Sequence, residues 1–141
     1  MKTFTATVAV LSVVLPSAFA QQSVSVSYDQ AFDVAGTSLN TVSCSDGKYG
    51  LEKKYHTFGG IPNFAHIGGA PTIPGWNSPN CGKCYQLTYE GKSIFVTAID
   101  AAPGGFNLAL AAMNDLTDGN AVDLGRVQAT YTEVAASNCG M

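Results

Sequence analysis

Hydrophobic and polar residues alternate along several segments of the chain, which is the pattern of a β-strand with one buried face. The alternation is strict over residues 24–28 and 85–89, and it returns over residues 127–134. Residues 93–99 are almost continuously apolar and β-branched, which predicts a strand that is covered on both faces and ends at Asp100. The pattern therefore predicts a mainly β protein.

Helical spacing of apolar residues is found in short segments. Residues 107–116 are predicted to form one helix with Asn107 as its N-cap, and a shorter helix is expected after Asp46. The Glu-Gly-Lys segment at 90–92 predicts a hairpin turn. With dominant strands and one or two short helices, the simplest architecture is a closed β-barrel, which avoids exposed sheet edges.

A Gly- and Pro-rich segment, residues 58–82, predicts a long loop of the kind that usually carries function or is pinned covalently. It contains the single Trp, Trp76, followed by Asn77 and Ser78. An aromatic ring beside amide and hydroxyl groups suits a sugar, because the ring packs on C–H faces while the polar groups bond hydroxyls. A core position is the alternative for Trp76, and Tyr28 has the same two interpretations.

The N-terminal residues have the order of a secretory signal peptide. Lys2 precedes a short apolar run at 8–15 and the small residues around Ala20, which predicts cleavage of residues 1–20. A membrane span needs about 20 apolar residues, so this run is too short for an anchor. Residues 21–141 are expected to be one secreted, extracellular domain.

The four cysteines lie in the predicted mature domain, where an oxidising compartment makes disulfides the expectation. Four cysteines allow three pairings, and two remain if Cys81 and Cys84 both bond outward. A redox-active pair would open a helix, whereas Cys84 opens a predicted strand. The second Cys-x-x-Cys of a strong zinc site is missing, and neither a metal nor another cofactor is expected.

Composition argues against nucleic-acid binding, and the candidate catalytic groups argue against hydrolysis. The formal net charge is −3, and 7 Lys and Arg residues form no basic face for nucleic acid. Hydrolysis needs two facing carboxylates, or a nucleophile beside a His. Asp100 is the one acid that ends a buried strand, and His56 and His66 lie outside catalytic motifs, so no enzyme activity is expected. Alternatively, Asp100 holds backbone N–H groups of the turn that follows it.

A set of motifs covers residues 24–139 and includes all four cysteines in order. The motifs are VSVSYD at 24–29, SCSDG at 43–47, GWNSPNCGKC at 75–84, SIF at 93–95, ID at 99–100, GGFN at 104–107 and SNC at 137–139. Together they resemble the cerato-platanin family of small secreted fungal proteins. The resemblance implies a six-stranded double-psi β-barrel, as in expansins and barwin-like proteins, with disulfides Cys44–Cys81 and Cys84–Cys139.

The resemblance also implies a function. Such proteins bind N-acetylglucosamine oligomers of the chitin type, or loosen cellulose, without hydrolysis, and they elicit plant defence in the manner of virulence factors. A plant receptor and self-assembly are further interactions that it implies. The alternative is a surface-active, self-assembling fungal wall protein that the host recognises without sugar binding, and such a protein should tolerate loss of Asp100.

Two site residues follow from matching this chain to the family. Asp100 corresponds to the acid at the end of the central strand, beside a shallow groove. Asn107 stands where expansins have an acid, and an amide can bond a sugar but cannot act as a general acid or base. We expect Asp100 and Asn107 to bond sugar hydroxyl and acetamide groups, with Tyr28 and Trp76 as apolar walls. Asn77 stands where some relatives have an acid, and if that acid contacts the ligand, its loss should weaken or redirect binding.

Overall fold

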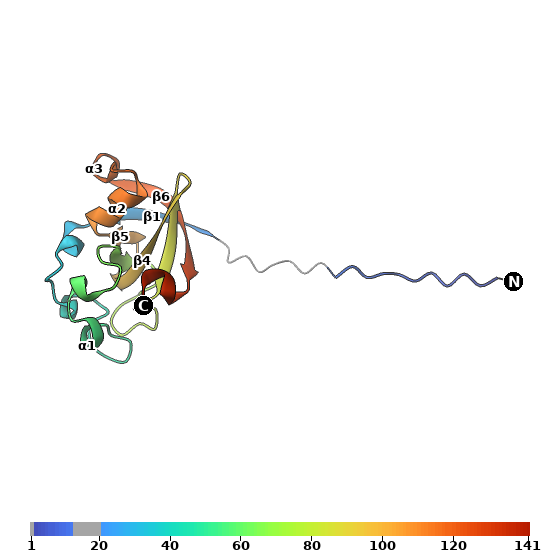
Figure 1. Ribbon diagram of the computed structural model, residues 1–141, viewed down its shortest axis with the longest axis horizontal. Coiled ribbons are helices and arrows are strands. Elements are labelled where there is room, and N and C mark those ends of the chain that lie inside the picture. The colour runs from blue at the N-terminus through green and yellow to red at the C-terminus, as the bar shows by residue number, and fades with distance from the viewer. Residues whose placement is uncertain (1, 13–20) are drawn as a thin grey trace.

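The structure of the protein is a computed structural model that describes residues 2–12 and 21–141. Residues 2–12 form neither a helix nor a strand and run away from the folded part of the chain with exposed side chains (Figure 1). The predicted cleavage site after Ala20 lies outside the described residues, so the signal peptide over residues 1–20 stays a prediction. No helix in the described part of the chain is long and apolar enough to span a bilayer.

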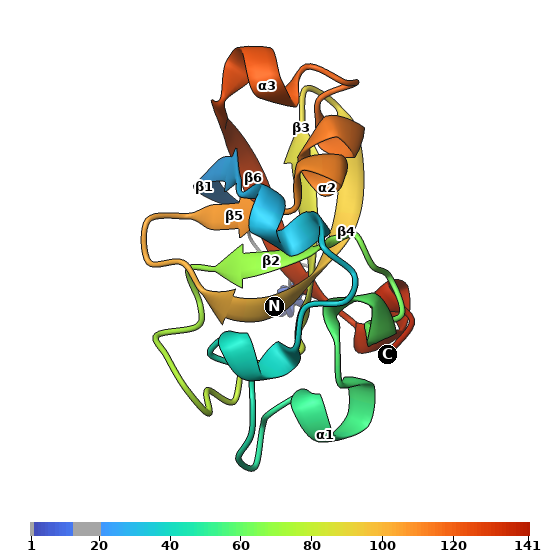
Figure 2. The same ribbon diagram turned by 90° about the vertical axis from the view of Figure 1, so that its left-hand side faces the viewer.

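Six strands of the described residues close into a barrel in the order β1-β5-β2-β4-β3-β6. The strands are β1 (Gln22–Tyr28), β2 (Ile67–Ala70), β3 (Cys84–Tyr89), β4 (Lys92–Ala101), β5 (Phe106–Leu108) and β6 (Arg126–Val134). β1 pairs with β5, and β2 with β4, in parallel, which requires crossover connections. Figure 2 shows β1, β5, β2 and β4 side by side. The predicted fold class, a mainly β six-stranded barrel, is confirmed.

The four segments with strand patterns form β1, β3, β4 and β6, and the residues between β3 and β4 form the predicted hairpin turn. β4 buries five of the seven residues that were predicted to be covered on both faces. Inside the core, the rings of Tyr85, Phe106 and Tyr131 pack edge to face, with centroids 5.2 to 5.9 Å apart. Burial raises the pKa of Tyr85, although its hydroxyl lies 2.6 Å from the hydroxyl of Thr72.

The described helices are short: α1 (Glu52–Tyr55), α2 (Leu110–Leu116) and α3 (Ala121–Leu124). The prediction that a helix begins at Asn107 was wrong, because Asn107 lies in β5 and α2 begins three residues later. Instead of an N-cap side chain next to α2, the carboxylate of Asp33 accepts the N–H groups of Leu110 and Ala111 at 2.7 and 3.0 Å. A residue distant in sequence thus caps this helix.

The prediction of an uninterrupted loop over residues 58–82 was also wrong, because this segment contains β2. All four residues of β2 (Ile-Gly-Gly-Ala) are buried between β4 and β5. A Cβ atom on Gly68 would lie 2.3 Å from the carbonyl oxygen of Asn107, so only glycine lets β5 approach this closely. Glycine therefore serves here as a strand residue rather than as a loop signal.

Two disulfides join the described parts of the chain, Cys44–Cys81 and Cys84–Cys139. This is the pairing that the family resemblance implied. Cys81 ends the Gly- and Pro-rich segment, so the first disulfide fixes that segment to the loop before α1, while the second fixes β3 to the C-terminal residues.

Candidate polysaccharide-binding site

Strand pairing places five residues in one row across neighbouring strands of the barrel. Arg126 pairs with Ser27, Ser27 with Asn107, Asn107 with Gly69, and Gly69 with Asp100. The residues that precede and follow Asn107 in β5 are buried, so the row lies on the outer face. Asn107 and Asp100, which we expected to act together, are two strands apart, about 10 Å at the usual strand spacing.

Asn107 lines a groove of about 590 Å³, which we call the Asn107 groove. Its lining residues are Ser27, Tyr28, residues 102–107, Gly125 and Arg126. The Ser27 hydroxyl donates to the Oδ1 atom of Asn107 at 3.1 Å, which orients the amide. The amide nitrogen of Asn107 has no hydrogen-bond partner among the described residues, so two donors remain for a ligand. The structure thus places Tyr28 and Asn107 in one groove, without Asp100 or Trp76.

Asp100 lines a second groove of about 420 Å³, the Asp100 groove. Its lining residues are Asp29, Ala31, Phe32, Val34, Thr37, Thr41, Val42, Phe58 and Asp100. The groove therefore combines two carboxylates with apolar side chains and two threonines. Sequence analysis did not single out Asp29. This residue directly follows Tyr28, so consecutive residues of the chain line the two grooves.

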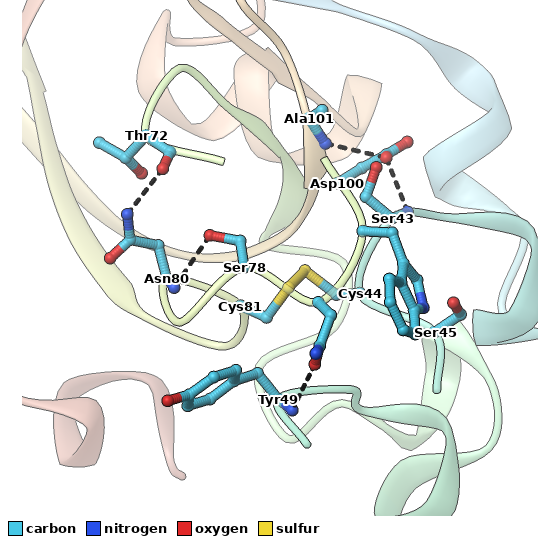
Figure 3. The surroundings of a disulfide bond; sticks show 12 residues. Ser43, Cys44, Ser45, Tyr49, Thr72, Ser78, Asn80, Cys81, Asp100 and Ala101 are labelled. Atoms are coloured by element: carbon cyan, nitrogen blue, oxygen red, sulfur yellow. Dashed lines mark hydrogen bonds between the residues drawn. A yellow bond between two sulfur atoms is a disulfide. The ribbon is translucent and has the colours of Figure 1, made fainter. Parts of the chain in front are cut away.

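The carboxylate of Asp100 also stabilises the backbone. Its Oδ1 atom accepts the N–H groups of Ser43 at 2.9 Å and of Ala101 at 2.8 Å (Figure 3). Ser43 precedes Cys44, so the Cys44–Cys81 disulfide lies next to the loop that this carboxylate holds. Asp100 therefore holds one N–H group of the segment that follows it, that of Ala101, as the structural alternative expected, and also one of a different loop, that of Ser43. The Oδ2 atom has no hydrogen-bond partner among the described residues.

Trp76, Asn77 and Ser78 are not among the described residues that line either groove. Trp76 is 63% exposed, and its Nε1 atom donates to Asp46 at 2.7 Å. Asn77 has a φ of 58° in the left-handed region, and its Oδ1 accepts the N–H of Tyr49 at 3.0 Å. Ser78 is buried, and its hydroxyl accepts a backbone N–H two residues further on. Of this trio, Trp76 is exposed, Asn77 is half-buried and Ser78 is buried.

Arg126 was missed by sequence analysis, although two signals in the sequence point to it. It is the only arginine of the chain, and it opens a segment with alternating residues. Ser27 had a signal too, because it is a polar residue between the apolar positions of β1. Neither signal reveals that these residues join Asn107, because that proximity depends on closure of the barrel.

Comparison with known proteins places this barrel in a family. The cerato-platanin family model matches residues 24–141. The chain is 69% identical over 116 residues to Allergen Asp f 15 of Aspergillus fumigatus, which covers 82% of this chain and 76% of that protein.

Solved structures agree with this assignment. The crystal structure of cerato-platanin 2 from M. perniciosa has a TM-score of 0.82 and 46% identity, and it covers 85% of this chain and 100% of its own. The solution structure of the fungal elicitor cerato-platanin has a TM-score of 0.76 and 42% identity, with coverage of 82% and 96%. The chain therefore belongs to the cerato-platanin family of fungal elicitor and allergen proteins.

Proposed function

We propose that the chain is a secreted, non-catalytic protein that binds polysaccharide on the outer face of its barrel and loosens it in the manner of expansins. The observation that carries the proposal is the row in which Ser27, Asn107 and Asp100 lie on neighbouring strands. The row offers donors at Asn107 and an acceptor at Asp100, separated by about 10 Å. N-acetylglucosamine oligomers or cellulose are the proposed ligands, because both present hydroxyl groups along an extended chain.

The proposed binding requires hydrogen bonds and apolar contact only. The free amide nitrogen of Asn107 donates to a sugar oxygen or an acetamide carbonyl, and the free Oδ2 of Asp100 accepts from a sugar hydroxyl. Tyr28 forms an apolar wall of the Asn107 groove. A bound chain exchanges its hydrogen bonds with neighbouring polysaccharide chains for bonds to the protein. Loosening therefore needs no covalent intermediate.

The Asp100 groove is where hydrolysis would have to occur if the protein were an enzyme, because Asp29 and Asp100 both line it. Glycoside hydrolysis uses such a pair as acid and base or nucleophile. In this protein each carboxylate also holds a backbone N–H group, that of Ala31 for Asp29 and those of Ser43 and Ala101 for Asp100. We expect no release of reducing ends from cellulose or chitin oligomers. Release that Asp29→Asn abolishes would contradict this.

The binding test compares affinities for the tetramer of N-acetylglucosamine and for cellotetraose. Asp100→Ala and Asn107→Ala are each expected to weaken binding about tenfold, the effect of one hydrogen bond to a charged or well-oriented group. Asp123→Ala, an exposed acid on α3, is the matched control and should leave affinity unchanged. Loosening of filter paper should fall with affinity in the same order. Unchanged affinity in both site variants would contradict the proposed site.

Elicitation of plant defence is the proposed consequence for the host, and the elicitor named among the relatives supports it. The second candidate function is surface activity with self-assembly. Exposed apolar side chains at Val34, Trp76, Val122 and Leu124 favour it. None of these residues belongs to the row, and Val34 alone among them lines the Asp100 groove, so self-assembly should persist in Asp100→Ala. Loss of both sugar binding and the plant response in this variant would favour the first candidate.

A further inference from the structure

Arg126 gives one end of the row a positive charge. The residue begins β6, pairs with Ser27 on β1 and is exposed. It is the only arginine of a chain whose formal net charge is −3. Its position therefore places a positive charge beside the groove.

The guanidinium of Arg126 has free hydrogen-bond donors. Its one hydrogen bond to a described side chain goes from a terminal nitrogen to the hydroxyl of Ser25. None of the salt bridges among the described residues involves Arg126, whereas Lys83 and Lys92 each contact a carboxylate. A guanidinium carries five N–H donors, so most of them remain for a ligand.

The groove that Arg126 lines contains no competing acid. None of the described residues that line the Asn107 groove is Asp or Glu. The lining residues with hydrogen-bonding side chains are instead Ser27, Tyr28, Asn107 and Arg126. Asp100 lines the other groove, and no carboxylate is within salt-bridge distance of Arg126 among the described residues. Donors and positive charge thus dominate the Asn107 groove.

We infer that the Asn107 groove binds an acidic sugar chain and that Arg126 recognises the carboxylate of a uronate unit. This inference rests on the proposed carbohydrate binding and names its substrate class at one end of the row. A planar guanidinium matches a carboxylate with two parallel N–H donors, which an ammonium group cannot do. A uronate at Arg126 with an adjacent sugar ring at Tyr28 and Asn107 would span the groove of about 590 Å³.

The test measures the affinity of residues 21–141 for trigalacturonate, for its methyl ester and for the N-acetylglucosamine tetramer. We expect trigalacturonate to bind about tenfold more tightly than its neutral ester, the effect of one charge-assisted hydrogen bond. Arg126→Gln should abolish this preference, and Arg126→Lys should restore only part of it. Lys54→Gln on α1 removes the same charge outside the groove and should retain the preference. Higher salt should weaken binding of the acid only.

Equal affinity for the acid and the ester would overturn the inference, and so would a preference that persists in Arg126→Gln. Thermal unfolding of each variant verifies that it folds. If the N-acetylglucosamine tetramer still binds in either case, the proposed function stands and only the role of Arg126 fails. Absence of binding for all three sugars would overturn the proposed function together with the inference.

Discussion

Removal of the Cys44–Cys81 disulfide should lower both stability and sugar affinity. The disulfide closes a loop of 37 residues, so in the chain-entropy model Cys44→Ala/Cys81→Ala lowers the free energy of unfolding by about 4 kcal/mol. For a domain of this size, roughly 4 °C per kcal/mol gives a Tm about 15 °C lower. The Cys84–Cys139 disulfide closes 55 residues, and the logarithmic dependence makes its removal only ~0.4 kcal/mol more costly.

The two disulfide variants should differ in binding rather than in stability. Ser43 directly precedes Cys44 and donates its N–H to Asp100, so loss of the first disulfide loosens a group that orients the carboxylate. Guanidinium unfolding measures both free energies, and the affinity for the N-acetylglucosamine tetramer is then measured where both variants are folded. We expect weaker binding in the first variant and unchanged binding in Cys84→Ala/Cys139→Ala. A stability loss below about 1 kcal/mol, or equal affinity changes, would refute the reasoning.

Three further predictions concern the barrel and its loops. Gly68→Ala places a Cβ 2.3 Å from a backbone oxygen of β5 and should lower the free energy of unfolding, measured in urea, by about 3 kcal/mol. Gly75→Ala is the control, because there is open space around Gly75, and it should change the free energy of unfolding little. Equal losses in the two variants would contradict the close approach of β2 and β5. Because burial raises the pKa of Tyr85, its contribution to stability is complete below pH 10 and falls as pH rises through the folded-state pKa. Tyr85→Phe should therefore flatten the decline in urea midpoint above pH 10, and a slope identical to the unsubstituted protein would count against this. Asn77→Ala should lower the free energy of unfolding by about 1–2 kcal/mol, because it removes a hydrogen bond to the N–H of Tyr49 and places alanine in a left-handed conformation. Asn77→Gly should lose only the hydrogen bond, because glycine adopts this conformation without strain. Equal decreases of Tm in the two variants would show that backbone strain is unimportant here.

Local sequence patterns predicted the strands that are long enough for buried and exposed side chains to follow a regular pattern. The strands β1, β3, β4 and β6 contain patterns that alternate or are almost continuously apolar over five residues or more, so period alone identifies them. β2 and β5 have four and three residues, too few for a period. β2 looks like a loop because two of its residues are glycine, and β5 looks like the start of α2 because its apolar residues extend the helical spacing. Their pairing partners, distant in sequence, make them strands.

In the candidate site, too, the sequence indicated individual residues but not which of them lie together. The family resemblance pointed to Asp100 and Asn107, and the structure places them on the same row but in different grooves. Which residue joins which groove depends on barrel closure, a non-local property that no window of sequence contains. Asp29 and Arg126 were therefore missed. Trp76 was expected as a wall of the groove, or else as a core residue, but it is exposed and lines neither groove, and its polar neighbours bond the local backbone.

The most direct test of the account is a titration of the isotope-labelled domain, residues 21–141, with the N-acetylglucosamine tetramer, followed by NMR shifts of the backbone amides. We predict that the largest shifts lie along the row at Ser27, Gly69, Asp100 and Asn107, on four neighbouring strands. The same shifts should be reduced in Asp100→Ala. Shifts confined to the loop around Trp76, or absent with both this tetramer and cellotetraose, would contradict the claim that the outer face of the barrel binds polysaccharide.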